Sequence, residues 1–246
     1  MRTFHWLLTL ALLAALTACA PASDSDAPDG DAQTAEAAPP EAEAPEADAG
    51  DAEMTPGEKA NAEFEDKAAG ADLLAALQAG GHIIYFRHTQ TERDYADQAD
   101  PNMSLDDCES QRKLSEVGIQ DAKDIGAAFT AKAIPVGQVI SSEYCRAWQT
   151  AELAFGRYEK NPKLNFLPFE EYTPEQVEEM KANVMPLLTA IPEDGTNTVL
   201  VGHDDIFESA TGIYPDPQGI AYVLTPSAEG TFELVANMLP AEWAGL

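Results

Sequence analysis

His82-Ile83-Ile84-Tyr85-Phe86-Arg87-His88-Thr89 is an apolar run that leads directly into an arginine and a histidine. Two further runs are alike: Val139-Ile140 leads into Ser141-Ser142, and residues 198–201 lead into Gly202-His203. Near-continuous apolar runs of this length are typical of strands that are buried on both faces of a parallel sheet. The three runs therefore predict the inner strands of one sheet.

Helical patterns separate these runs. Within residues 115–131, Val117, Ala122, Ile125 and Phe129 recur at helical spacing and predict one buried face. Strands that alternate with helices predict an α/β fold, a three-layer sandwich with a mostly parallel central sheet flanked by helices. The expected elements are helices over 71–79, 115–131 and 146–155, a helix capped by Thr173, and a closing hairpin over 221–224 and 232–235.

Four positively charged or chargeable side chains follow the predicted strands. Arg87 and His88 end the first strand, His203 follows the third, and Arg146 begins the helix after the second. Because the carboxyl ends of parallel strands meet at one edge of a sheet, we expect these side chains to lie together. Such a cluster is costly in repulsion and desolvation unless an anion binds to it. Phosphate fits best, since guanidinium groups bind its oxygens in pairs.

The charge of the chain is spread unevenly. Of 246 residues, 43 are acidic and 14 are basic, and twelve of the acidic ones lie in residues 20–58, which contain no Lys or Arg. A segment so rich in Ala, Pro and acidic residues cannot bury enough surface to fold. We therefore expect a disordered acidic tether over residues 19–66 and one domain over residues 67–246. The net charge of −29 excludes nucleic acid as a partner, because backbone phosphates require clustered Lys and Arg.

The chain begins with a targeting segment. An apolar run over residues 7–16 is too short to span a bilayer and is typical of a signal peptide. Leu16-Thr17-Ala18-Cys19 resembles a bacterial lipobox, which implies a lipoprotein signal peptide over residues 1–18 and a lipid anchor to the membrane at Cys19. A plain secretory signal with an incidental cysteine is the alternative. Because Ala20 rather than aspartate follows the cysteine, the lipobox implies the outer membrane of a Gram-negative cell envelope, facing the periplasm.

Four separated motifs resemble those of the histidine phosphatase superfamily, the phosphoglycerate-mutase-like clan, in order and spacing. They extend over about residues 80–203. The fold of that family is an α/β three-layer sandwich, which agrees with the pattern of strands and helices. The motifs are Tyr85-Phe86-Arg87-His88-Thr89, Leu114-Ser115-Glu116-Val117-Gly118, residues 141–151 around Arg146, and Val201-Gly202-His203.

The resemblance implies phosphoryl transfer through a histidine. His88 is then the nucleophile that forms a phosphohistidine intermediate. Arg87 and Arg146 hold the phosphoryl oxygens, and His203 completes the pocket and stabilises the charge that develops during transfer. The resemblance implies no metal and no cofactor, because the two arginines and His203 supply the positive charge.

The proton donor to the leaving group stays open. In the mutase-like branch of the family a glutamate follows the second arginine motif, and this chain has Glu170 and Glu171 near that place. In the acid-phosphatase branch the donor directly follows the second histidine, where this chain has Asp204. Some small members that act on phosphohistidine have no dedicated acid. A solvated surface carboxylate is the alternative for each of the three residues.

Residues 90–113 form a long segment between the nucleophile and the next helix, and its Arg112 is expected either to touch substrate or to lie at the surface, as is Arg93. With Cys19 lipidated, Cys108 and Cys145 remain. In an oxidising compartment this even count favours a disulfide, which would tie the segment to the rim of the phosphate site. Two buried free thiols are the alternative.

The sequence as a whole predicts a metal-independent phosphatase that hydrolyses a phosphomonoester or a phosphoramidate. Its expected partner is a small phosphorylated substrate, and the expected location favours one of the cell envelope. A lipoprotein that binds a phosphorylated ligand without turning it over is the alternative. A hydrolase that uses two carboxylates is disfavoured, because no pair of acidic residues stands out by spacing.

Overall fold

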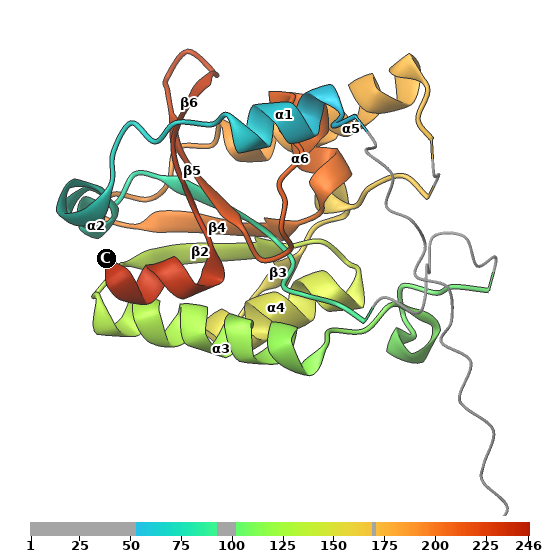
Figure 1. Ribbon diagram of the computed structural model, residues 1–246, viewed down its shortest axis with the longest axis horizontal. Coiled ribbons are helices and arrows are strands. Elements are labelled where there is room, and N and C mark those ends of the chain that lie inside the picture. Colours follow the sequence, from blue (N-terminus) through green and yellow to red (C-terminus); the bar gives the residue numbers. More distant parts are fainter. Residues whose placement is uncertain (1–52, 93–101, 169–170) are drawn as a thin grey trace, which may run out of the picture. The chain divides into compact units, whose positions relative to one another are not determined.

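A six-stranded sheet in the order β3-β2-β4-β1-β5-β6 forms the centre of the computed structural model (Figure 1). The structure describes residues 53–92, 102–168 and 171–246, all within one unit, Gly50–Leu246. Neighbours among β1 to β4 pair in parallel, and the antiparallel β5–β6 hairpin joins β1, so the expected sheet and closing hairpin are confirmed. The strands are β1 (Ile83–Arg87), β2 (Val136–Ser141), β3 (Glu159–Lys160), β4 (Asn197–Gly202), β5 (Ala221–Pro226) and β6 (Phe232–Met238).

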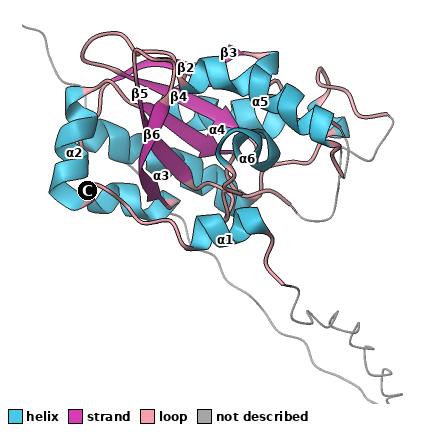
Figure 2. Ribbon diagram, turned by 90° about the horizontal axis from the view of Figure 1, so that it is seen from above, coloured by secondary structure: helices cyan, strands magenta, loops and turns pink. Residues whose placement is uncertain are grey.

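Helices cover both faces of the sheet (Figures 1 and 2). On one face, α2, α3, α4 and the short helix η4 enclose a core that contains Phe86 and Trp243. On the other face, α1, α5 and α6 enclose a core that contains Tyr85 and Phe207. Successive residues of β1 thus enter opposite cores, which confirms the three-layer α/β sandwich. The helices are α1 (Pro56–Ala62), α2 (Gly70–Ala79), η2 (Cys108–Ser110), α3 (Glu116–Ala131), α4 (Cys145–Phe155), η3 (Pro162–Leu164), α5 (Pro174–Leu188), α6 (Asp204–Thr211) and η4 (Pro240–Gly245).

The starts of two helices follow directly from their local sequence. The Oγ of Ser115 accepts a hydrogen bond from the backbone N–H of Gly118 and caps α3. Thr173 and Gln176 form a reciprocal capping box at the start of α5. Both helices begin where the sequence predicts.

One residue of the predicted buried face of α3 is not buried. Val117 is 57% exposed, whereas Ala122, Ile125 and Phe129 lie in the core. Val117 stands in the first turn of the helix, where it lines a cavity beside Arg87. Its position at helical spacing was therefore a correct indication of the helix but a wrong indication of burial.

The folded part begins earlier than the predicted boundary at residue 67, because α1 lies inside the range assigned to the tether. Gly57 in α1 is buried, and its carbonyl accepts a hydrogen bond from the backbone N–H of Tyr214. The side chain of Asn61 contacts Asp216, and the ring of Phe64 packs edge-on against Tyr222. These contacts to residues more than 150 positions away stabilise a short helix that its own composition would not predict.

Residues 1–52 lie outside the described residues. They include the predicted signal peptide, the predicted lipidation site Cys19 and most of the predicted tether. Within the part that the structure describes, no helix has the length and apolar character needed to cross a membrane.

Candidate active site

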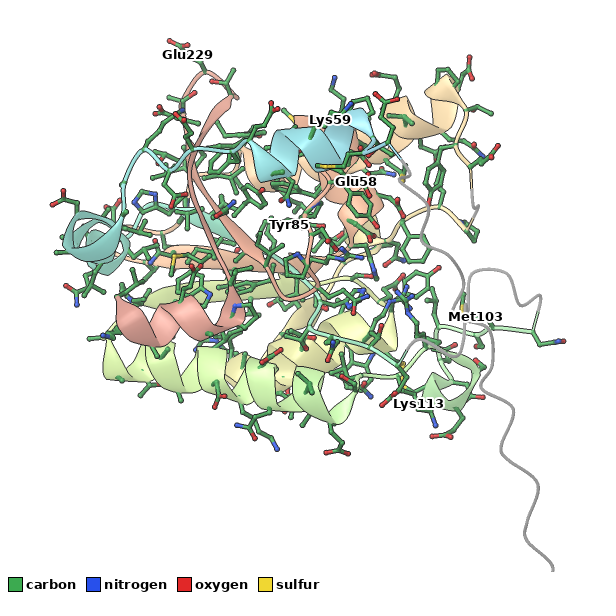
Figure 3. All side chains as sticks on the ribbon, in the orientation of Figure 1. Glu58, Lys59, Tyr85, Met103, Lys113 and Glu229 are labelled. Carbon is green, nitrogen blue, oxygen red and sulfur yellow. A yellow bond between two sulfur atoms is a disulfide. The ribbon has the colours of Figure 1, made fainter. Side chains whose placement is uncertain are left out.

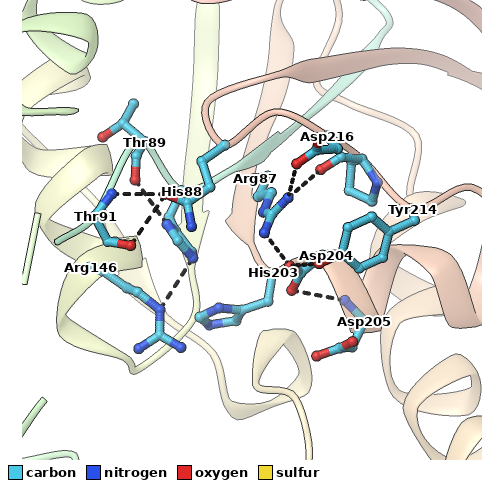
Figure 4. Close-up of polar contacts among 12 residues, drawn as sticks. Arg87, His88, Thr89, Thr91, Arg146, His203, Asp204, Asp205, Tyr214 and Asp216 are labelled. Carbon is cyan, nitrogen blue, oxygen red and sulfur yellow. Dashed lines mark hydrogen bonds and ion pairs between the residues drawn. The ribbon is translucent and has the colours of Figure 1, made fainter. Parts of the chain in front are cut away.

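The sheet brings the ends of β1 and β4 together. Arg87 pairs with Gly202 in the parallel register, and the next residues along both strands are His88 and His203. The backbone N–H of His88 donates to the carbonyl of Gly202 at 3.0 Å. The two imidazole rings lie edge-on with their centroids 5.4 Å apart (Figure 4). The register therefore places both histidines at one edge of the sheet, as the sequence predicts.

The hydrogen bonds of His88 fix its tautomer. Nδ1 lies 2.9 Å from the carbonyl oxygen of Thr89, which can only accept, so Nδ1 carries the proton. Nε2 then bears a lone pair, and it accepts from Nε of Arg146 at 3.2 Å. The side chain is buried, with 1% exposed, and this burial lowers its pKa well below the ordinary value. The positive charges of Arg146 and Arg87 lower that pKa further, so His88 is neutral.

Arg146 is placed by the first turn of α4. Its guanidinium lies over the rings of Tyr144 and Phe166, at 4.9 and 5.4 Å from their centroids. Its carbonyl accepts from Oγ1 of Thr150, which also accepts from the backbone N–H of Thr89. The helix that carries Arg146 is thus bonded to the residue that follows His88.

Two contacts position His203. The hydroxyl of Tyr85 accepts from the backbone N–H of His203 at 2.9 Å and donates to its carbonyl at 2.7 Å. The ring Nε2 lies 2.9 Å from Oγ of Ser142, and that hydroxyl donates to Oδ1 of Asn165. Because the Ser142 proton is used on Asn165, Nε2 of His203 is the donor to Ser142. Burial lowers the pKa of His203 well below its ordinary value, and the charge of Arg146 lowers it further.

Arg87 is held by two carboxylates. Its Nη2 forms an ion pair with Asp204, and its Nη1 lies 3.1 Å from Oδ1 of Asp216 and donates to the carbonyl of Pro215. Its guanidinium also lies over the ring of Tyr214. Within the described residues, Nε of Arg87 is buried and has no hydrogen-bond partner. A buried N–H of a charged group without a partner is costly, and a bound anion would relieve that cost.

The structure separates the candidate acids. Asp204 lies in the cluster, where it pairs with Arg87 and accepts from the hydroxyl of Tyr214 at 2.8 Å. Glu171 is exposed in the segment before α5, and Glu170 lies outside the described residues. Asp205 adjoins Asp204, and both burial and the neighbouring charge of Asp204 raise its pKa well above the ordinary value. Asp205 therefore holds a proton more tightly than an isolated carboxyl group would.

A disulfide joins Cys108 to Cys145, the pairing expected from the cysteine count. It links the segment before α3 to the residue next to Arg146. The buried side chain of Gln111 makes a second link, since its Oε1 accepts from the backbone N–H of Cys145 at 2.8 Å. No pattern in the sequence marks Gln111 or Asn165 as part of the site, and the motif that contains Tyr85 does not indicate its contact with His203. Ser142 could have been suspected, because it follows the second strand.

A cavity of about 600 Å³ opens beside Arg87. Arg112 and Gln90 line it, and so do Val117 and Leu239, two of the four large apolar side chains that are exposed in the described residues. Within the same described residues, no three His, Cys, Asp or Glu side chains are grouped so that they could hold a metal ion.

The fold and the site together define an α/β protein with a buried cluster of two arginines and two histidines at the carboxyl edge of its parallel strands. No protein-family model matches the chain, and no curated protein matches it. Solved structures are similar to it. The protein histidine phosphatase SixA complexed with tungstate is 15% identical, with 65% of this chain and 98% of that chain covered and a TM-score of 0.47.

Two others are similar at the same level. A phosphoserine phosphatase mutant from Entamoeba histolytica in complex with phosphoserine is 14% identical, with 63% of this chain and 95% of that chain covered and a TM-score of 0.42. Bacillus stearothermophilus YhfR is 16% identical, with coverages of 63% and 95% and a TM-score of 0.41. The function proposed below for this chain rests on its own residues.

Proposed function

We propose that this chain is a phosphatase that hydrolyses a phosphomonoester, or a phosphoramidate, through a phosphohistidine intermediate on His88. The observation that carries the proposal is the state of His88: a neutral, buried imidazole with its proton fixed on Nδ1 and a lone pair on Nε2 that faces Arg146. A histidine nucleophile needs this tautomer. The arginine clamp beside the lone pair is the group that a phosphoryl oxygen requires.

In the proposed reaction the phosphoryl oxygens replace Nε2 of His88 as the partner of Arg146 and engage Nε of Arg87. The freed lone pair of Nε2 attacks phosphorus, and the bond from phosphorus to the leaving oxygen or nitrogen breaks. The leaving group takes up a proton. Water then attacks the phosphohistidine, which releases inorganic phosphate and restores neutral His88. The two arginines stabilise the charge on the transferred group, so the reaction as proposed uses no metal. A bound phosphoryl dianion raises the pKa of His203, which lets its Nδ1 take up a proton and add to that stabilisation.

Asp204 delivers the proton in this proposal, because it is the one of the three candidate carboxylates that the described contacts tie to Arg87. The proton comes to it from its neighbour Asp205, whose pKa is raised to about 7. Asp204 can then accept the proton of the attacking water in the second step.

We further propose that the mature protein is a lipoprotein, anchored through Cys19 to the outer membrane and facing the periplasm, and that its substrate is a small phosphorylated compound of the cell envelope. The support is the lipobox-like sequence before Cys19 and the acidic segment that follows it. The disulfide between Cys108 and Cys145 suits an oxidising compartment of this kind.

Turnover of p-nitrophenyl phosphate by the purified chain tests the phosphatase proposal. We expect hydrolysis by the unchanged protein, loss of at least about a thousandfold in His88→Ala, and acid-labile phosphate on the quenched unchanged protein. His82→Ala is the matched control, because His82 lies at the start of β1 and bonds to Thr225 away from the site.

Activity of His88→Ala within about tenfold of the unchanged protein would remove His88 as the nucleophile. Absence of turnover at every pH, with inorganic phosphate still bound, would show a phosphate-binding protein that has no enzymatic activity.

A further inference from the structure

The segment between β1 and α3 is closed at its base beside the site. Thr91 and Leu114 form an antiparallel bridge, and the backbone N–H of Glu92 donates to the carbonyl of Lys113. The backbone N–H of Ser115 donates to the carbonyl of Gln90. Arg112 lies two residues before Leu114. The returning strand of the segment therefore runs next to the chain that leaves His88.

Two links fasten this segment to the start of α4. One is the disulfide between Cys108 and Cys145, and the other is the hydrogen bond from the backbone N–H of Cys145 to Gln111. Gln111 is 1% exposed, and its Nε2 also donates to the carbonyl of Ser104 at 2.7 Å. The two links start at Cys108 and Gln111, on either side of a single turn. Both end on Cys145, the residue before Arg146. Arg112, directly after Gln111, is thus held at a fixed place relative to Arg146.

Arg112 faces the site from this position. It is half-buried and lines the same cavity of about 600 Å³ as Arg87 and Gln90. Its positive charge contributes to the lowered pKa of His88 and of His203, so it acts on both imidazoles.

Lys113, the next residue, contrasts with Arg112. It is exposed (Figure 3) and pairs with Glu109 at 2.6 Å. Both residues line a second cavity of about 410 Å³, but Arg112 also lines the cavity beside Arg87, whereas Lys113 does not and forms a surface ion pair.

We propose that Arg112 is a third cationic ligand of the phosphoryl group, and that the Cys108–Cys145 disulfide and Gln111 hold it in place for that role. The inference rests on the proposed phosphate site but not on turnover. The ligand class that it favours is a phosphomonoester dianion, because a third guanidinium adds most to the ligand with the higher charge.

The proposal makes phosphate affinity depend on the disulfide. Reduction by a dithiol transfers two electrons and two protons to the bond between the sulfurs, which leaves two thiols here and a disulfide on the reductant. Segment 102–111 then keeps Gln111 as its link to Cys145, and Arg112 is less firmly placed.

Calorimetric titration with inorganic phosphate, on the full chain, tests the proposal. Arg112→Met is expected to raise the Kd for phosphate about tenfold or more, the loss of one charge-assisted hydrogen bond, and Lys113→Met to change it less than about twofold. The double variant Cys108→Ser/Cys145→Ser is expected to raise the Kd as well. Arg112→Met added to that double variant should then cost less than it does with the disulfide intact, because both changes act on one contact.

A second readout separates a ligand from a merely structural residue. Removing the charge of Arg112 should raise the pKa of His88, so the acid limb of kcat/KM for p-nitrophenyl phosphate should move to higher pH in Arg112→Met. Unfolding curves without phosphate identify any variant that fails to fold. If Arg112→Met does not fold, Arg112→Lys takes its place in the phosphate titration. Because Arg112→Lys keeps the charge, the acid limb of its kcat/KM profile should stay where it is in the unchanged protein.

Three results would overturn the inference: phosphate binding within about twofold of normal in folded Arg112→Met, full additivity of Arg112→Met with the cysteine changes, or absence of phosphate binding in the unchanged protein. The last result would also remove the proposed phosphate site. Binding that depends on Arg112 in a protein without turnover would support the inference and contradict only the proposed catalysis.

Discussion

Nε of Arg146 donates a hydrogen bond to Nε2 of His88 at a distance of 3.2 Å. An arginine that donates to a histidine nitrogen requires that nitrogen to be unprotonated. The arginine therefore holds the lone pair of His88 in place, and it occupies the direction from which an electrophile would approach. A phosphoryl oxygen that accepts the hydrogen bond of Arg146 in place of Nε2 would at the same time free the lone pair of His88.

The two buried histidines should make the protein less stable in acid. Their pKa values are lowered in the folded state, so between those values and about 6.5 the unfolded chain binds more protons than the folded chain. Their contribution to stability is complete above the unfolded pKa and is lost as the pH falls below it. Each histidine should remove up to about 1.4 kcal/mol of unfolding free energy per pH unit.

Urea unfolding between pH 8 and pH 5 measures this dependence. The double variant His88→Gln/His203→Gln is the control, because it lacks both groups and keeps Asp205. The raised pKa of Asp205 acts in the opposite direction, since the folded state then binds the extra proton, and its contribution grows as the pH falls. Equal slopes in the two proteins would show that the histidines are not held neutral.

Leaving-group dependence should identify the acid. In Asp204→Asn we expect kcat on an alkyl phosphate to fall about a hundredfold or more, because an alkoxide must be protonated as it leaves. On p-nitrophenyl phosphate, whose leaving group is already stable as an anion, the fall should be much smaller. Glu171→Gln, which changes an exposed carboxylate, should alter neither rate. Equal losses on both esters in Asp204→Asn would mean that Asp204 acts only by holding Arg87.

Tyr85→Phe should lower both stability and turnover. The hydroxyl of Tyr85 lies inside the fold and serves both backbone polar groups of His203, so its removal leaves two buried groups without a partner (Figure 3). The expected cost is about 1–3 kcal/mol of unfolding free energy, together with a lower kcat because His203 loses its support. Tyr222→Phe is the matched control, since its hydroxyl bonds to Asn61 and not to His203, so it should lower stability and leave kcat unchanged. A normal kcat in folded Tyr85→Phe would show that His203 needs no such support.

Asn61→Ala should weaken the link between α1 and the loop that holds Arg87. The amide of Asn61 donates to the carbonyl of Asp216 at 2.7 Å and accepts from the hydroxyl of Tyr222. We expect a loss of about 1–2 kcal/mol in unfolding free energy and a higher KM, because Asp216 pairs with Arg87. Lys59→Ala on the exposed face of the same helix provides the comparison in thermal and kinetic assays. An unchanged KM would confine the role of α1 to stability.

The sequence predicts the sheet and the cluster at its edge for a clear physical reason. Buried parallel strands appear in a sequence as continuous apolar runs, and their carboxyl ends meet at one edge of the sheet. Arg87, His88 and His203 could therefore be predicted from the sequence alone to lie together. Arg146 follows from the helix after the second strand. The disulfide follows from a count of cysteines.

The parts that the sequence did not reveal depend on contacts between distant residues. Tyr85 lies 118 positions from His203, and in the sequence it is one more large residue in an apolar run. Gln111 and Asn165 are polar residues in irregular segments, where no periodicity marks them. The helix α1 has few apolar residues, and its contacts with Tyr214, Asp216 and Tyr222 hold it in place.

The capping box of α1, in which Thr55 and Glu58 bond to each other's backbone, sets the upstream limit for any shortened form of this protein. A chain cut at residue 59, or at the predicted boundary of 67, would keep every residue that is proposed to contact the phosphoryl group and still lose part or all of the helix whose Asn61 bonds to Asp216. The minimal functional chain should therefore begin before Thr55.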